Sequence, residues 1–186
     1  YIAHMYHDLV AGLDINTPCP PVKINVPTAD INAAEMEQKN LDIKDTGYIS
    51  LYDSGNLLYP IDKWQKIVAD IQQKQPELSI TLLQAFGNNQ WVNEMLRACS
   101  NLKVISAPDV GKLAAMIAGA NLVICPNSAV LPLATAVDTY TIALVDSANA
   151  VKFIPPDNEN CIGVQSSTNK IADIKPEVIL EKIWQG

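Results

Sequence analysis

The segment that most constrains the fold is residues 122–137, which read Leu-Val-Ile-Cys-Pro-Asn-Ser-Ala-Val-Leu-Pro-Leu-Ala-Thr-Ala-Val. An apolar run, a short polar turn and a run of small residues predict a buried strand followed by a helix. In α/β proteins such a unit presents backbone N–H groups at the helix start, where they can bind an anion. The turn contains no charged residue, so a site here depends on backbone donors, Asn127 and Ser128.

A simpler interpretation of the same turn is that Asn127 or Ser128 only caps the helix, because such caps are commoner than phosphate sites. Pro132 bears on both interpretations, since a proline inside a helix removes a backbone hydrogen bond. We therefore predict a turn over residues 126–130, with the helix starting near Leu131 and Pro132 at its first position.

From residue 47 onward, strands and helices alternate. Short β-branched runs predict strands at 48–52, 79–84, 103–106, 121–125, 140–145 and 161–165. Helices are expected between them: one opened by Pro60 at its first position, one at 91–99, one capped by Asp109 and one at 175–184. The alternation predicts an α/β fold, a Rossmann-like, doubly wound parallel sheet of about six strands with helices on both faces.

Residues 1–46 predict an arm that precedes this domain of residues 47–186. The arm combines a helix ending at Gly12, a proline-rich linker at 16–21, a short strand at 22–26 and a helix at 28–41, capped by Thr28 or Asp30. The chain begins at Tyr1 within the first helix, which suggests a fragment of a longer protein.

Composition excludes several classes of protein. The net charge of −7 argues against a nucleic-acid partner. No apolar run reaches the roughly 20 residues of a transmembrane segment, and the start lacks the pattern of a signal peptide. None of the four cysteines lies in a C-x-x-C pair, so we expect free thiols in a reducing cytoplasm and no zinc site. His4, His7 and Asp8 share a helix face that could suggest a metal, although a solvated face is the simpler interpretation.

Ligands of such sheets bind beyond the carboxyl ends of the strands. The loop with Ser54 and Gly55 is either a plain turn or a ligand loop. Residues 87–90 follow the second strand and could contact a base or a sugar, but polar loop residues are usually only solvated, which is the simpler interpretation. Further polar loops at this edge span 107–109, 146–149 and 166–169, in which Asp109 and Asp146 are candidate bases, Asp109 being more simply a helix cap.

Two enzyme classes lack their signatures. Both histidines precede residue 47, so no nucleophile–histidine pair is visible for a hydrolase. A dinucleotide-dependent oxidoreductase would need a glycine fingerprint that the chain does not contain.

Three stretches carry a resemblance to glycosyltransferase family 9, the bacterial lipopolysaccharide heptosyltransferases. Residues 59–68 (Tyr-Pro-Ile-Asp-Lys-Trp-Gln-Lys-Ile-Val) are similar to the family's W-P-x-x-x-(W/F)-x-x-L helix opening. Residues 111–124 are similar to L-x-x-L-A-A-L-I-x-x-A-D-L-V-I, and residues 126–145 follow N-D-S-G-P-M-H-L-A-A-A-L-G-x-P-V-V-A-L. The arm also resembles the stretch between the family's two domains.

The chain departs from these motifs at polar positions. Asn127 stands at the signature Asp, Ala129 at the Gly and Pro132 at the His, whereas Ser128 matches. The Lys expected before the Trp-Pro pair has no counterpart. Losing that Lys removes a positive charge for the leaving phosphate, and electrostatic stabilisation is usually a large catalytic term.

The resemblance implies the C-terminal, donor-binding half of a GT-B enzyme, which transfers a sugar from a nucleotide-sugar donor, with ADP as a candidate carrier. Transfer would be inverting and need no metal or cofactor. The implied donor contacts are Ser54, Gly55, Asn127, Ser128 and Ala129.

The family's catalytic base and acceptor contacts lie in an N-terminal domain, which would be this chain's partner, so the chain alone is expected to be inactive. The resemblance also implies a cytoplasmic protein, peripheral to the inner membrane in its full form. A homodimer is a further hypothesis. The alternative function is a non-catalytic relative that serves in binding or protein interaction, which the departures at Asn127, Ala129 and Pro132 favour.

Overall fold

The computed structural model describes residues 2–10, 13, 17–148, 150–156 and 158–185. Tyr1, Gly12, Asn16 and Asn149, which figured in the predictions above, lie outside the described residues. The strands are β1 (Tyr48–Leu51), β2 (Ser79–Gln84), β3 (Leu102–Ser106), β4 (Leu122–Pro126), β5 (Thr141–Val145) and β6 (Cys161–Gln165). The helices are α1 (Ile2–Val10), α2 (Thr28–Asn40), α3 (Ile61–Lys74), α4 (Asn89–Ala98), α5 (Val110–Ala118), α6 (Val130–Ala136), α7 (Ala150–Phe153) and α8 (Pro176–Gln185), with a 3-10 turn, η2 (Ile171–Asp173).

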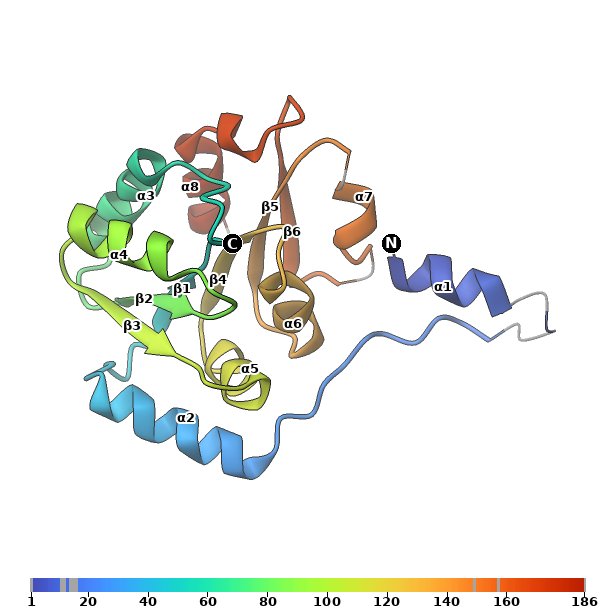
Figure 1. The fold of residues 1–186 in the computed structure, drawn as a ribbon, viewed down its shortest axis with the longest axis horizontal. Helices are drawn as coiled ribbons and strands as arrows, with labels where there is room; N and C mark the ends of the chain where they lie inside the picture. The colour runs from blue at the N-terminus through green and yellow to red at the C-terminus, as the bar shows by residue number, and fades with distance from the viewer. Residues whose placement is uncertain (1, 11–12, 14–16, 149, 157, 186) are drawn as a thin grey trace.

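The six strands form one parallel sheet in the order β3-β2-β1-β4-β5-β6 (Figure 1). The chain builds the sheet outward from β1 to β3 and then returns to the other side of β1 with β4. This order confirms the predicted Rossmann-like α/β fold. The reversal between β1 and β4 is the switch point at which doubly wound sheets leave a crevice for ligands.

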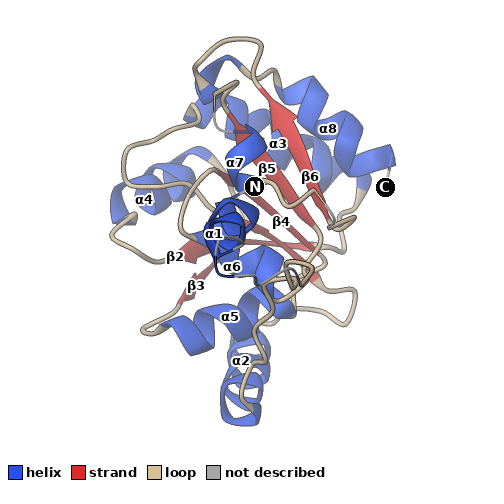
Figure 2. Ribbon diagram, turned by 90° about the vertical axis from the view of Figure 1, so that its right-hand side faces the viewer, coloured by secondary structure: helices blue, strands red, loops and turns tan. Residues whose placement is uncertain are grey.

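Helices cover both faces of the sheet (Figures 1 and 2). On one face, α3, α4 and α8 pack over Leu51, Leu82 and Ile124 and bury Trp64 and Trp91. On the other face, α5 and α6 pack over alternate strand residues, and α2 lies against the outer side of α5. The four central strands, β1, β2, β4 and β5, are buried on both faces, which explains why their sequences are mostly apolar, whereas the edge strands β3 and β6 are partly exposed.

The arm differs from the prediction in two places. Residues 22–26 form no strand: their one recorded backbone bond within the described chain is from the Ile24 N–H to the Ala136 carbonyl at 2.8 Å. Prolines at both ends of this segment, Pro21 and Pro27, have no N–H to offer a neighbouring strand. Neither Thr28 nor Asp30 caps α2, because Pro27 occupies the capping position and Thr28 is already helical.

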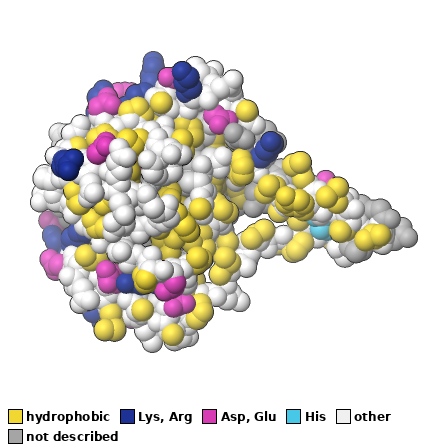
Figure 3. Space-filling view, viewed as in Figure 1, with side chains coloured by type: hydrophobic (Ala, Val, Ile, Leu, Met, Phe, Trp, Pro, Cys, Tyr) yellow, Lys and Arg dark blue, Asp and Glu magenta, His cyan; other side chains and the backbone are white. Residues whose placement is uncertain are grey.

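Helix α1 projects from the body of the domain, and apolar side chains gather on it (Figures 1 and 3). None of its described residues is buried, and Met5, Tyr6 and Leu9 are exposed. No helix among the described residues is long and apolar enough to cross a membrane.

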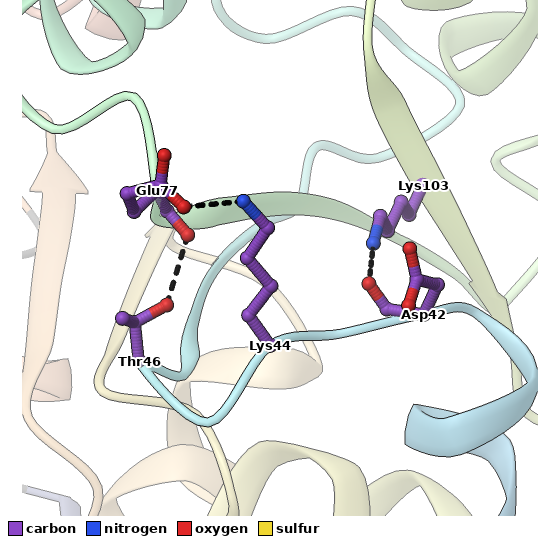
Figure 4. Close-up of polar contacts among 5 residues, drawn as sticks. All are labelled: Asp42, Lys44, Thr46, Glu77 and Lys103. Carbon is purple, nitrogen blue, oxygen red and sulfur yellow. Dashed lines mark hydrogen bonds and ion pairs between the residues drawn. The ribbon is translucent and has the colours of Figure 1, made fainter.

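In contrast to α1, α2 and the loop after it are fixed to the domain. Lys44 pairs with Glu77, and the Thr46 hydroxyl donates to the Glu77 carbonyl at 2.8 Å (Figure 4). The Lys103 ammonium donates to the Asp42 carbonyl, which connects the same loop to β3. These contacts hold the start of β1 in register with β2 and β3.

Candidate functional site

The candidate site lies at the carboxyl edge of the sheet, at the switch point between β1 and β4. The two strands pair directly, with Ile49 opposite Leu122 and Leu51 opposite Ile124. The β1–α3 loop, residues 52–60, contains Ser54 and Gly55. The β4–α6 loop, residues 127–129, consists of Asn127, Ser128 and Ala129. The topology thus brings both predicted loops to neighbouring positions.

The β1–α3 loop is organised around a buried carboxylate. The Asp53 side chain is 0% exposed and accepts hydrogen bonds from the backbone N–H groups of Ser54 (2.7 Å), Leu58 (3.0 Å) and Tyr59 (2.9 Å). The Trp64 indole donates a further bond at 3.3 Å. Burial raises the pKa of Asp53, and these four hydrogen bonds oppose that rise without cancelling it.

The groups that Ser54 and Gly55 retain for a ligand are few. The Ser54 hydroxyl accepts from the Asn56 N–H at 3.3 Å, which leaves its own hydrogen free to donate. Gly55 lies against the neighbouring loop, where an added Cβ would stand 3.2 Å from the Gly87 carbonyl oxygen. Glycine therefore serves here for close packing of two loops.

Asn88 connects that neighbouring loop, between β2 and α4, to the first one. Its buried side-chain amide donates to the Asp53 and Leu83 carbonyls, both at 2.9 Å, and accepts from the Ala85 N–H at 3.0 Å. All three bonds lie inside the protein, so Asn88 is a structural tie rather than a solvated loop residue. The expectation of a merely solvated loop is therefore wrong at Asn88, while Asn89 and Gln90 are exposed as expected.

The β4–α6 loop has free donors. The Asn127 N–H donates to the Leu144 carbonyl at 2.9 Å, but the N–H groups of Ser128, Ala129 and Val130 have no backbone partner among the described residues. Neither Asn127 nor Ser128 caps α6 through its side chain; Ala129 occupies the capping position. The simple capping interpretation of this turn is therefore wrong.

The Ser128 hydroxyl oxygen is buried and has no hydrogen-bond partner in the described chain. The thiol of Cys125 is close enough for that hydroxyl to lower its pKa slightly, although burial raises the pKa of Cys125 overall. A thiol is a weak hydrogen-bonding group, so Ser128 retains a strong bond to make.

The start of α6 also corrects the prediction for Pro132. Helix α6 begins at Val130, so Pro132 is its third residue and not its first. The first four N–H groups of a helix have no intrahelical partner, so a proline at the third position removes no hydrogen bond. Pro60, predicted as the first residue of a helix, instead lies one position earlier, as the residue that precedes α3. Its missing N–H likewise costs no intrahelical hydrogen bond.

An apolar notch of about 130 Å³ opens beside these loops at the same edge. Its wall includes the side chains of Phe86 and Val110, each 56% exposed. The lining residues are Ala85, Phe86, Ala107, Pro108, Asp109, Val110 and Leu113. Nothing in the periodicity of the sequence marked Phe86, whose positive φ of 53° turns it outward from the end of β2.

The candidate bases are used locally. The Asp109 carboxylate accepts from the Lys112 N–H at 2.8 Å and caps α5, as predicted. The Asp146 carboxylate accepts from the Ala148 N–H at 3.0 Å. Neither the β1–α3 loop nor the β4–α6 loop contains a lysine or arginine, so these two loops offer an anion only dipoles.

The residues of the arm do not join this site. Among the described residues, no group of three or more His, Cys, Asp or Glu side chains is arranged to hold a metal ion. His4 instead lines a cavity of about 250 Å³ together with Cys19 and several prolines, between the arm and α6.

The fold and the site define a Rossmann-type α/β domain whose carboxyl edge has backbone N–H groups without a backbone partner among the described residues. A model of glycosyltransferase family 9 (heptosyltransferase) matches residues 14–183. Since this match covers most of the chain, the protein belongs to that family.

Solved structures share the fold of this chain. The fold is similar to a family 9 glycosyl transferase from Veillonella parvula DSM 2008, with a TM-score of 0.79 and 13% identity, over 96% of this chain and 57% of that one. It is also similar to the E. coli ADP-heptose lps heptosyltransferase II, with a TM-score of 0.72 and 13% identity, over 92% and 55% of the two chains. The chain thus spans little more than half of these proteins.

One relative found by sequence is named as a subunit of a complex and not as a glycosyltransferase. The photosynthetic NDH subunit of subcomplex B 1, chloroplastic, from Arabidopsis thaliana is 31% identical over 125 residues, which are 66% of this chain and 26% of that protein. The chain spans about a quarter of this relative.

Proposed function

We propose that this domain is the nucleotide-sugar side of a family 9 protein and that it binds a nucleoside diphosphate at the switch point. One observation carries the proposal: the N–H groups of Ser128, Ala129 and Val130 and the Ser128 hydroxyl have unused hydrogen-bonding capacity in one turn. Unpaired N–H groups at the start of a helix can bind phosphate oxygens. Asn127 adds a neutral side chain. Ser54 and Gly55 lie in the loop that follows the adjacent strand, β1.

The apolar notch suits the flat base of the nucleotide. It lies at the ends of β2 and β3, to one side of the switch point, and its wall of Phe86, Pro108 and Val110 offers apolar contact but few polar groups. A structure of the E. coli heptosyltransferase WaaC contains ADP, and another contains ADP-2-deoxy-2-fluoro heptose. Adenosine diphosphate is therefore the first nucleotide to test.

We do not expect sugar transfer by this chain alone. The loops contain no cation to neutralise a leaving diphosphate, and Asp109 and Asp146 both accept hydrogen bonds from their own loops. Electrostatic stabilisation of the leaving group is usually a large part of catalysis. Binding through neutral dipoles, with catalytic groups supplied by another domain if at all, is the activity that these residues support.

The second candidate is a non-catalytic domain that serves in assembly. The observation that favours it is the closed β1–α3 loop, in which Asp53 takes up the N–H groups of Ser54, Leu58 and Tyr59. The Arabidopsis relative is named as a subunit of a larger complex, which is consistent with such a role.

The test is a thermal-shift titration with ADP, UDP, GDP and ADP-heptose at millimolar concentration. A ligand at about 100 times its Kd adds roughly 2.7 kcal/mol, which raises the melting temperature by several degrees. Two matched variants locate the site: Ala129→Trp places bulk on the free N–H groups, and Ala148→Trp places it on an exposed loop of the same edge.

A shift with one nucleotide that Ala129→Trp abolishes and Ala148→Trp retains would support the proposal and name the base. If none of these ligands shifts the wild-type protein, nucleotide binding by this chain is refuted and the assembly role becomes the better account.

A further inference from the structure

The surroundings of Asp53 resemble those of a bound anion more than those of a side chain that merely caps a turn. Three backbone N–H groups, from Ser54, Leu58 and Tyr59, converge on one carboxylate at 2.7–3.0 Å. The Trp64 indole completes the set from α3. All four donors are neutral, and no lysine or arginine contributes a recorded hydrogen bond or ion pair to Asp53 within the described residues.

These donors stand where an α/β protein of this topology binds phosphate. They lie in the loop that follows β1, at the switch point, and the last of the three backbone donors is two residues before the start of α3. A concave set of backbone N–H groups at this position is a general anion-binding arrangement. Here the anion is supplied by the chain itself.

We propose that the β1–α3 loop is a preformed anion site and that the chain's own Asp53 carboxylate permanently occupies it. An external phosphate is then excluded from this loop and left with the β4–α6 loop alone. The occupancy stands independently of the proposed function; only the consequence for a nucleotide ligand rests on it.

The frame around the donors does not depend on the carboxylate. The Tyr59 ring is fully buried, and its hydroxyl donates to the Ile174 carbonyl at 3.1 Å. Trp64 is fixed between two aromatic rings, with ring centroids 5.2 Å from Tyr59 and 6.0 Å from Trp91. Asn88 holds the Asp53 carbonyl at 2.9 Å. The donors are therefore expected to keep their places when the side chain is shortened.

Chemical rescue tests this expectation. Asp53→Ala removes the carboxylate and leaves a void that formate can fill. We expect sodium formate at about 0.5 M to raise the melting temperature of this variant by about 2–4 °C, in a saturable way, relative to sodium chloride at the same ionic strength. Asp53→Asn fills the void with a neutral side chain, and Asp62→Ala removes an exposed carboxylate from the first turn of α3; neither should respond to formate.

Rescue confined to Asp53→Ala supports a preformed anion site. A folded Asp53→Ala protein that responds to formate no more than to chloride overturns the proposal, because the nest then exists only while the aspartate builds it. Nucleotides take no part in this experiment, so its failure and the failure of nucleotide binding are separate results.

A measurement on the wild type keeps the inference testable if Asp53→Ala does not fold. Inorganic phosphate is titrated into the ¹⁵N-labelled protein while the backbone amide signals of Ser54, Leu58 and Tyr59 are followed. Occupancy by Asp53 predicts that these three signals stay in place up to about 50 mM phosphate, whether or not those of residues 128–130 move. A saturable shift of the three signals would show that the loop accepts an external anion and would overturn the proposal.

Discussion

Two loops at one edge of the sheet follow adjacent parallel strands but differ in how their backbone N–H groups are paired. In the β1–α3 loop, three N–H donors converge on the buried Asp53 carboxylate. In the β4–α6 loop, the N–H groups of Ser128, Ala129 and Val130 have no backbone partner in the described chain, and a buried hydroxyl has none either. Both are strand–loop–helix units, but the β1–α3 loop is longer, residues 52–60 against 127–129, and it contains its own acceptor, Asp53.

The comparison teaches that position at a switch point does not make a loop a ligand loop. A buried polar group must be paired, and Asp53 pairs the donors of its loop internally. Under the proposed function, a ligand would bind the β4–α6 loop, whose N–H groups at residues 128–130 have no backbone partner in the described chain. The following substitutions separate the two loops, beginning with the largest expected effect.

Asp53→Ala should destabilise the domain by roughly 3–5 kcal/mol, because it leaves several buried donors without an acceptor. Urea unfolding followed by tryptophan fluorescence measures this, since Trp64 is itself one of the donors. The matched change Asp62→Ala, on the exposed first turn of α3, should cost at most about 1 kcal/mol. Equal costs for the two variants would mean that the donors of this loop lose nothing when the Asp53 carboxylate is removed.

Asn88→Ala should cost roughly 2 kcal/mol, because two carbonyls and one N–H group lose their partner in a buried position. The neighbouring change Asn89→Ala is its control. Asn89 is exposed and only accepts from the Gln84 side chain at 3.0 Å, so its loss should change the free energy of unfolding by no more than about 0.5 kcal/mol. Similar values for both would contradict the role of Asn88 as a tie between loops.

The fold was largely predictable because its signals are local and repeated. All six strands lie within one residue of their predicted ends, since parallel strands buried on both faces are short, continuous apolar runs. The predictions failed where a strand-like sequence has no neighbouring strand to pair with. Residues 22–26 alternate like a strand, yet no sheet edge is available to them, and Ile24 bonds to the end of a helix instead.

The site was predictable in place but not in chemistry. The order of strands follows from alternation and right-handed crossovers, so both loops could be assigned to one edge. The hydrogen bonds of Asp53 and Asn88 could not be predicted. They join residues that are up to 35 positions apart, and they depend on how the side chains are oriented. The sequence Asp53-Ser54-Gly55 is as typical of a plain turn as of a ligand loop. Only the structure shows that the buried carboxylate pairs the N–H groups that a ligand would need.

The pH dependence of stability gives a third test of the closed loop. Burial raises the pKa of Asp53 above its ordinary value of 3.8, so the folded state binds its proton more tightly than the unfolded state does. The pH-dependent part of the Asp53 contribution to stability is therefore full below pH 3.8 and is lost as the pH rises through the folded-state pKa. The free energy of unfolding of the wild type, minus that of Asp53→Asn, should fall over this interval. A difference that is constant with pH, or that rises, would contradict this sign.

The smallest effect on stability is expected in the open loop. Ser128→Ala removes a buried hydroxyl that has no hydrogen-bond partner in the described chain, so the free energy of unfolding should change by no more than about 0.5 kcal/mol. Ser50→Ala is the matched comparison: its buried hydroxyl lies 2.8 Å from that of Thr81, and its loss should cost about 1–2 kcal/mol. If Ser128 binds a nucleotide phosphate, Ser128→Ala should also weaken ADP binding about fivefold, the value of one hydrogen bond, while Ser50→Ala should leave it unchanged. Equal ADP affinities of Ser128→Ala and the wild type would show that the Ser128 hydroxyl takes no part in binding, and calorimetric titration of both variants with ADP decides this.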